Sequence, residues 1–260
     1  MGNIDLNKSE QYILSIRFSA DGFSFVIHHP QNEEYSCTTY PVDSSYSMTA
    51  NIKKMLAVTD ELKHTYQTTN ILFDTSRFTF VPFELFEDEQ TEDIFHHNFA
   101  KKENETIMCN ILGKSNVALL FGMDKHAHQL LAEQLPKARI YACISPLMEN
   151  FTRKNKEENT KSLYVHLHAN KMDIFAFDKG KLLIANTFHC KQLSDKTYYI
   201  LYIWQQLGFN QKRDNLWLAG NTDSEKKELL LELNRFIQSV NICPEKELIP
   251  YDIQILMTCE

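Results

Sequence analysis

The segment from Lys161 to Cys190 constrains the fold of this chain more than any other. It contains three apolar runs, 163–168, 172–177 and 182–188, separated by the polar groups Ala169-Asn170-Lys171 and Asp178-Lys179-Gly180. Short apolar runs joined by tight polar turns predict two successive β-hairpins, that is, a three-stranded meander. Side chains in the first run alternate between apolar and polar, whereas the next two runs carry apolar side chains on both faces. We therefore expect the second and third strands to be covered on both faces.

The element order of this region also occurs near the start of the chain. After the meander, a helix is predicted with Ser194 as its N-cap and Gly208 at its end. In the first half, strands are expected at 12–18, 23–28 and 35–40, followed by a helix over about 47–64 and a strand at 70–74. Separations of roughly 144 to 150 residues align Ile13 with Leu163, Gly22 with Lys171, Phe23 with Met172, Ile52 with Ile200 and Leu72 with Leu216. Residue identities hardly match, so the pattern predicts a duplication of element order and length.

The remaining segments complete an α/β chain of two lobes. The first lobe is expected to span residues 1–152, with an inserted helix and hairpin at about 83–122. The nine residues from Arg153 to Lys161 contain no apolar side chain, which indicates a linker at 153–160. The second lobe then covers 161–260, with a strand at 215–219, a helix after it and a last strand at 241–243.

Composition excludes several functional classes. The chain has 260 residues, a formal net charge of -7 and only short basic clusters, which gives no electrostatic footprint for nucleic acid. No apolar run approaches the roughly 20 residues of a membrane span, and the polar start MGNIDLNKSEQ lacks the apolar core of a signal peptide. The six cysteines lie far apart without a C-x-x-C pair. We therefore expect reduced thiols in a cytoplasmic protein.

Three strands, helix, strand, helix, strand and helix, present twice, resemble the duplicated ribonuclease-H-like lobes of the actin, sugar-kinase and heat-shock-chaperone superfamily. Within it, the chain most resembles a family of uncharacterised bacterial proteins of about this length with an actin-like ATPase fold. It is more distantly similar to the actin-like scaffolds of pilus assembly and type II secretion. The resemblance covers roughly residues 11 to 258 and depends on element order more than on sequence motifs.

The resemblance implies where a nucleotide would bind. Active members carry an Asp and glycines in the first hairpin of each lobe, so that backbone N–H groups reach the phosphates and carboxylates hold hydrated magnesium. Here the first hairpin reads Arg17-Phe-Ser-Ala-Asp21-Gly22, and the second reads His166-Leu-His168-Ala-Asn170-Lys171, with neither Asp nor Gly. The third motif, near the adenosine, reads Leu218-Ala219-Gly220-Asn221. The candidate cleft positions are therefore Arg17, Asp21, Gly22, His166, His168, Asn170, Gly220 and Asn221, and the site they form is degenerate.

Three functional hypotheses follow. The leading one is a non-catalytic binding or scaffold protein, a pseudo-ATPase without a cofactor, whose partner is a protein; Tyr198, Tyr199 and Tyr202 leave aromatic surface for such a partner. The alternative is a nucleotide-binding protein or weak ATPase that uses ATP and magnesium in the interlobe cleft. A metal- or histidine-dependent hydrolase comes third, because His166 and His168 share a strand face. No third or fourth ligand has recognisable spacing, so no metal ligands are assigned. Neither the partner nor the oligomeric state follows from the sequence.

Overall fold

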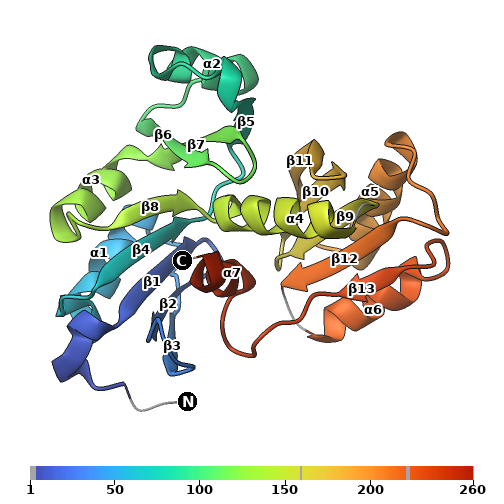
Figure 1. Ribbon diagram of the computed structural model, residues 1–260. Coiled ribbons are helices and arrows are strands. Elements are labelled where there is room, and N and C mark those ends of the chain that lie inside the picture. Colours follow the sequence, from blue (N-terminus) through green and yellow to red (C-terminus); the bar gives the residue numbers. More distant parts are fainter. Residues whose placement is uncertain (1–3, 159, 221–222, 260) are drawn as a thin grey trace. The chain divides into compact units, whose positions relative to one another are not determined.

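The computed structural model describes residues 4–158, 160–220 and 223–259, which fold into two compact units. Unit 1 comprises Met1–Pro146 and Leu256–Glu260, and unit 2 comprises Leu147–Ile255. The chain passes from the first unit to the second within helix α4 (Ile144–Glu158) and returns within helix α7 (Tyr251–Cys259). Figure 1 labels these elements.

The main sheet of unit 1 has the strand order β3-β2-β1-β4-β8. Strands β1 (Ile13–Ser19), β2 (Gly22–His28) and β3 (Tyr35–Tyr40) form the predicted antiparallel meander. Strand β4 (Thr68–Phe73) pairs with β1 in parallel, and β8 (Arg139–Ala142) pairs with β4 in parallel. This is the arrangement that the alternating pattern and the following helix–strand unit predicted.

Helices α1 (Met48–Val58) and α3 (Lys125–Gln134) supply the core on one face of this sheet. Ile52 and Leu131 belong to the same buried cluster as Ile16 of β1. Helix α1 begins at the predicted place, because the Ser47 hydroxyl accepts the Ala50 N–H at 3.2 Å. It ends earlier than predicted, since Thr59 adopts an extended backbone conformation, and a short 3₁₀ helix, η2 (Asp60–Lys63), follows.

The insertion in unit 1 forms a small sheet with the order β5-β7-β6. Strands β6 (Glu105–Leu112) and β7 (Val117–Asp124) make the predicted hairpin, and β5 (Phe78–Pro82) pairs with β7. The helix expected at the start of this insertion is shorter than its acidic stretch 82–100, which forms the 3₁₀ helices η3 (Phe83–Leu85) and η4 (Asp88–Gln90) and then α2 (Thr91–Asn98). Phe95 of α2 is fully buried against this sheet, which anchors the segment.

Unit 2 repeats the topology of unit 1 with the strand order β11-β10-β9-β12-β13. Strands β9 (Lys161–Leu167), β10 (Lys171–Asp178) and β11 (Lys181–His189) form the antiparallel meander. Strands β12 (Asn215–Gly220) and β13 (Val240–Ile242) continue the sheet in parallel from β9. The predicted duplication of the α/β lobe is therefore confirmed.

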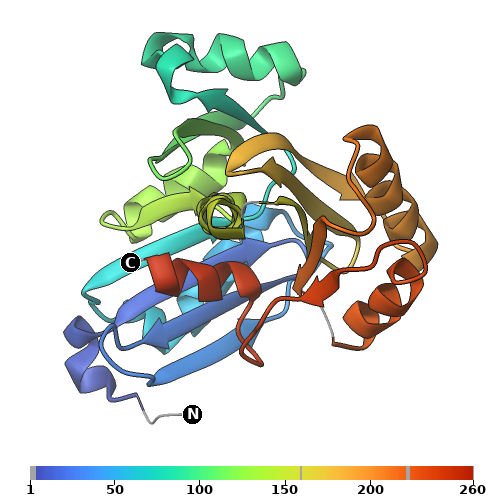
Figure 2. The ribbon, with the colours of Figure 1, turned by 45° about the vertical axis from the view of Figure 1, so that its right-hand side comes forward.

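Helices α5 (Leu193–Gln206) and α6 (Asp223–Leu233) lie on one face of this sheet (Figure 2). Trp204 and Leu229 pack with Val165 of β9 in the core of unit 2. Gly208 ends α5 as predicted, with a left-handed φ of 62°. Ser194 is not the cap, because α5 begins at Leu193 and its N-cap is Gln192, two residues before the predicted one.

Helix α4 supplies aromatic packing on the other face of the unit 2 sheet. The ring of Phe151 stacks on Tyr164 of β9 at 4.4 Å and meets Phe175 of β10 edge-on at 5.3 Å. The predicted burial of both faces holds for β10 but not for β11, which is an edge strand with alternating exposure. The segment 153–160, expected as a linker, is helical through Glu158 as the end of α4.

The hairpin registers define which residues correspond between the two units. Phe18 pairs with Phe23 before the first turn, and Leu167 pairs with Met172 at the same place in unit 2. This correspondence places Ile13 on Ser162 rather than on Leu163, so the alignment from the sequence was one residue out at this strand. A shift of one residue exchanges the two faces of a strand, and the core-facing Leu14 in fact matches the core-facing Leu163.

None of the helices in the described ranges is long and apolar enough to cross a membrane.

Candidate functional site

The predicted site residues fall into two groups, one in each unit. Arg17 lies near the end of β1, and Asp21 and Gly22 form the turn into β2. In unit 2, His166 lies near the end of β9, and His168 and Asn170 belong to the turn into β10. Gly220 ends β12, and Asn221 lies outside the described residues. Each group is therefore gathered at the first hairpin of its unit.

In unit 1, the predicted residues surround an open cavity of about 340 Å³. The Arg17 guanidinium lies 3.4 Å from the Asp21 carboxylate, whose side chain is 39% exposed. Nearby, the Ser19 hydroxyl donates to the Asp74 carboxylate at 2.9 Å. The structure thus brings Arg17, Asp21 and Gly22 together beside one cavity, with Asp21 paired to the Arg17 guanidinium. The lining residues of the cavity are Arg17, Asp21, Gly22, Phe23, Ser24, Thr39, Tyr40 and Pro41.

In unit 2, the corresponding positions form a buried polar network. His168 Nε2 lies 2.7 Å from Asp173 Oδ2, and His166 Nδ1 lies 3.5 Å from the same oxygen. The Thr187 hydroxyl donates to the other carboxylate oxygen, Oδ1, at 2.6 Å. His166, His168 and Asp173 are each less than a tenth exposed. The Asp173 carboxylate of β10 thus lies beside two imidazoles, one on β9 and one in the turn that follows it. The same carboxylate accepts a hydrogen bond from the Thr187 hydroxyl of β11.

Electrostatics favour an ionised carboxylate and a neutral imidazole in this network. Burial alone would raise the pKa of Asp173, but the attraction and hydrogen bond of His168, together with the nearby His166, outweigh it and hold the pKa well below its usual value. Burial, and then the neighbouring His168, lower the pKa of His166. Because the carboxylate is charged, His168 Nε2 carries the proton of the 2.7 Å hydrogen bond.

Gly220 packs directly against the His166 ring. Its φ is +75°, and a Cβ at this position would lie 2.6 Å from both His166 Cδ2 and the Leu167 carbonyl oxygen. Only glycine fits such a left-handed, crowded backbone. The Gly220 N–H donates to Glu245 Oε1 at 2.7 Å, and Glu245 Oε2 accepts from Lys226 Nζ at 2.7 Å. The third predicted motif is therefore occupied by a carboxylate of the chain itself.

A second buried lysine, Lys196, contacts the backbone of the β9–β10 turn. Lys196 of α5 is fully buried, donates to the His168 carbonyl at 3.1 Å and pairs with Glu225 of α6. Asn170, by contrast, is exposed at the tip of the turn, where its carbonyl accepts the Cys190 N–H at 3.1 Å. The backbone of the turn is thus fixed from inside the unit.

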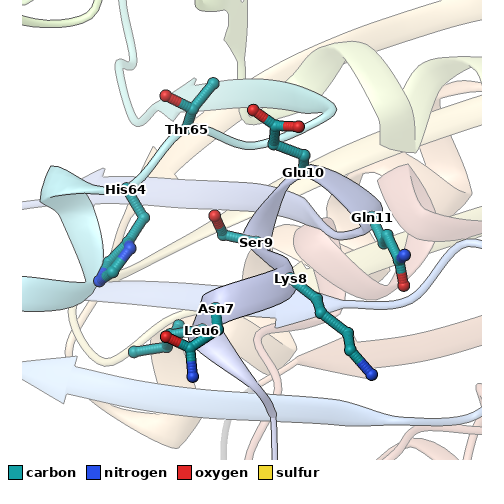
Figure 3. Close-up of a pocket in the computed structure, with 8 residues that line it drawn as sticks. All are labelled: Leu6, Asn7, Lys8, Ser9, Glu10, Gln11, His64 and Thr65. Atoms are coloured by element: carbon teal, nitrogen blue, oxygen red, sulfur yellow. The ribbon is translucent and has the colours of Figure 1, made fainter.

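Other candidate groups do not converge on a site. Gly113-Lys114-Ser115 forms the turn of the predicted hairpin between β6 and β7, where the Ser115 N–H donates to the Leu112 carbonyl at 3.2 Å. A cavity of about 440 Å³ lies beside the 3₁₀ helix η1 (Leu6–Gln11), next to His64 and Thr65 (Figure 3). Its Lys8, Glu10 and His64 side chains point in different directions, so they cannot act on one reacting atom.

Sequence reasoning missed Asp173, Thr187 and Glu245. Asp173 offered one signal: it is the only charged residue in the apolar run 172–177, and a charge in a buried strand needs partners. Thr187 and Glu245 offered none, because their contacts cross strands or distant loops.

Comparisons with known proteins identify the fold. The family model described as "Protein of unknown function (DUF3822)" matches residues 2–240. The chain is 45% identical, with a TM-score of 0.91 over 100% of both chains, to a Bacteroides thetaiotaomicron protein with actin-like ATPase fold and unknown function. It matches a chain of a PilM–PilN type IV pilus biogenesis complex at 10% identity and a TM-score of 0.57, covering 89% of this chain and 88% of that one. None of the curated proteins searched matches the sequence. The chain thus has the actin-like ATPase fold, as its element order predicted.

Proposed function

The chain belongs to the family described as Protein of unknown function (DUF3822), and from that premise we propose that it is a cytoplasmic, non-catalytic protein that binds a protein partner. In this proposal the nucleotide site of the fold has degenerated. The observation that carries it is that the groups which would hold a nucleotide are already paired within each unit. The cytoplasmic assignment is supported by the five described cysteines, which are free thiols.

The second unit supports the loss of phosphate binding most strongly. A phosphate needs backbone N–H groups that it can approach closely. The Gly220 N–H instead donates to Glu245, whose negative charge would also repel a phosphate. At the β9–β10 hairpin, two buried imidazoles and Asp173 fill the positions beside the turn.

Magnesium is poorly provided for in both units. Mg²⁺ keeps most of its waters and uses one or two carboxylates near the phosphates. Asp21 is paired with Arg17, and Asp173 is buried and bonded to Thr187 and His168. These residues do not fit a hydrated magnesium nucleotide.

An exposed aromatic pair on α5 supports the partner half of the proposal. Tyr198 is 61% exposed and Tyr202 is 48% exposed, and their rings stack at 6.0 Å. Tyr199 turns inward onto Phe188 at 4.9 Å. Exposed tyrosines are enriched at protein interfaces because an apolar ring carries a polar tip. A protein of this fold also occurs in the PilM–PilN complex.

Thermal unfolding tests the nucleotide half. A ligand at 100 times its dissociation constant stabilises a protein by about 2.7 kcal/mol, which shifts the melting temperature of a chain this long by several degrees. We expect millimolar ATP with magnesium to produce no shift relative to magnesium alone. A reproducible rise of several degrees, lost in Asp21→Ala, would instead establish the nucleotide-binding alternative.

Capture on immobilised protein tests the partner half. We expect the wild-type chain to retain a specific protein from an extract of its own cells, and the Tyr198→Ser/Tyr202→Ser variant to lose it. Tyr46→Ser is the matched control, because Tyr46 is a similarly exposed tyrosine (58%) in unit 1. Retention of the same protein by both variants would contradict the assignment of this surface.

A further inference from the structure

We propose that His166, His168 and Asp173 bind one divalent transition-metal ion, of which Zn²⁺ is the best match, inside unit 2. The donor atoms of the three side chains lie within 4.8 Å of one another, and all three residues are buried. Two imidazoles and one carboxylate make a donor set that zinc uses in proteins. The site is independent of the proposed partner surface on α5.

A hydrogen bond from Thr187 orients the Asp173 carboxylate for metal binding. Thr187 donates to Asp173 Oδ1 at 2.6 Å, which leaves Oδ2 directed at the two histidines. Hydrogen bonds from outside the ligand set orient metal-binding carboxylates in this way. Lys196 fixes the backbone of His168, since it donates to the carbonyl of that residue at 3.1 Å.

Two of the three donor separations, those that include Asp173, require only a small adjustment; the two imidazole nitrogens lie within 4.8 Å of each other and would move closer together around the ion. Two donors that each lie about 2.0–2.1 Å from a tetrahedral zinc ion are about 3.3–3.4 Å apart. His166 Nδ1 and Asp173 Oδ2 already stand at 3.5 Å. His168 Nε2 and the same oxygen stand at 2.7 Å, because a proton bridges them. Replacing that proton by the ion lengthens this separation by about 0.6 Å and leaves the other almost unchanged.

His166 provides the observation that points to a ligand. Its Nδ1 is buried and makes no hydrogen bond in the structure, because the 3.5 Å separation from Asp173 is too long for a well-formed one. A buried polar nitrogen without a partner is destabilising, because it has lost its hydrogen bonds to water. A metal ion between His166 and Asp173 would satisfy this nitrogen.

Negative charge around the three side chains favours the binding of a cation. Asp173 contributes one negative charge, and Asp252 is a second fully buried carboxylate that acts electrostatically on His166. Two carboxylates balance the charge of a divalent ion, which lowers the cost of burying it. The exposed residues Ala169 and Asn170 directly follow His168, so the site lies beside the solvent-facing tip of the β9–β10 turn.

Metal titration of the purified full chain, stripped with a chelator, tests the proposal. We expect one equivalent of Zn²⁺ to bind in competition with a chromophoric chelator, and Co²⁺ to give the intense visible spectrum of a four-coordinate site. His168→Gln and Asp173→Asn should abolish both signals. Thr187→Val, which keeps all three ligands, should weaken zinc affinity by about 10–100-fold.

His189→Gln is the control, because His189 is an exposed histidine in the neighbouring strand β11. It should bind zinc as the wild type does. The proposal fails if the wild type binds no zinc, or if His168→Gln and Thr187→Val, shown to be folded by circular dichroism, bind it with wild-type affinity. Metal analysis of the protein as purified then distinguishes zinc from iron, which also binds two histidines and a carboxylate.

Discussion

The first hairpins of the two units share a backbone but carry different chemistry. Arg17 of β1 pairs with Ser24 of β2, and at the same register His166 of β9 pairs with Asp173 of β10. In unit 1, the result is a partly exposed ion pair beside an open cavity. In unit 2, the result is a closed network of two histidines, an aspartate and a threonine. Topology therefore fixes where a site can lie, and the side chains decide what it does.

The two networks should contribute differently to the free energy of unfolding, because they differ in burial. The Arg17 side chain is only 8% exposed but Asp21 is 39% exposed, so water screens their ion pair, which contributes about 0–1 kcal/mol. Removing one partner from a buried charged network costs about 3–5 kcal/mol, because the remaining groups lose their compensation. Substitutions at matched positions make this comparison measurable.

The largest effect is expected from the two aspartates. Asp173→Ala should lower the free energy of unfolding of unit 2 by about 3–5 kcal/mol, and Asp21→Ala should lower that of unit 1 by less than about 1 kcal/mol. Urea unfolding of metal-free protein measures both. Trp204 and Trp217, the two tryptophans of the chain, lie in unit 2 and report on it, while circular dichroism follows both units. Equal losses of unfolding free energy in the two variants would contradict the expected difference between the two networks.

A smaller effect is expected at the glycine beside His166. Gly220→Ala introduces a Cβ in a left-handed conformation, which costs about 1–2 kcal/mol, and overpacking against the imidazole adds about 1–3 kcal/mol. Gly208→Ala is the matched control in unit 2, because its φ is also positive but a Cβ there meets nothing within 4 Å. Tryptophan fluorescence in urea should show the larger loss for Gly220→Ala. Equal losses would mean that the contact with His166 adds nothing.

The smallest effect concerns the thiols of the two units. Burial raises the pKa of both Cys37 and Cys243, so both react slowly at neutral pH, but Cys37 is half-buried and Cys243 is fully buried. We expect alkylation of the native protein, followed by mass spectrometry, to modify Cys37 before Cys243. After denaturation without reductant, six thiols should react, the number in the sequence. A denatured count near zero would overturn the cytoplasmic assignment.

Local patterns predicted the frame of both units but little of the networks inside them. The meanders followed from alternation and turn residues, such as Lys179 and Gly180, which adopt left-handed φ values of 51° and 81°. The supposed linker shows where such reasoning fails. Asn155 lies in that polar run, yet it is buried in α4 and bonds the Thr160 carbonyl and the Gly180 N–H. The polar composition of the run predicted exposed side chains, whereas in the folded chain Asn155 is buried and has hydrogen-bond partners.

The side-chain network at the candidate site followed only in part from the sequence. His166 and His168 were identified from their shared strand face, but Asp173 completes their network from the next strand and Glu245 reaches Gly220 from a distant loop. Such contacts depend on register and loop packing, for which a single sequence gives no spacing rule.

The ring nitrogens of His166 and His168 test the central claim most directly. Long-range proton–nitrogen NMR, with the two residues assigned from His→Gln variants, reports the protonation and environment of each ring. We predict that millimolar ATP with magnesium leaves these resonances unchanged, because His168 and Asp173 are already hydrogen-bonded to each other and Asp173 to Thr187. Saturable shifts of both histidines on addition of ATP and magnesium would show that unit 2 still receives a nucleotide, and would contradict the account.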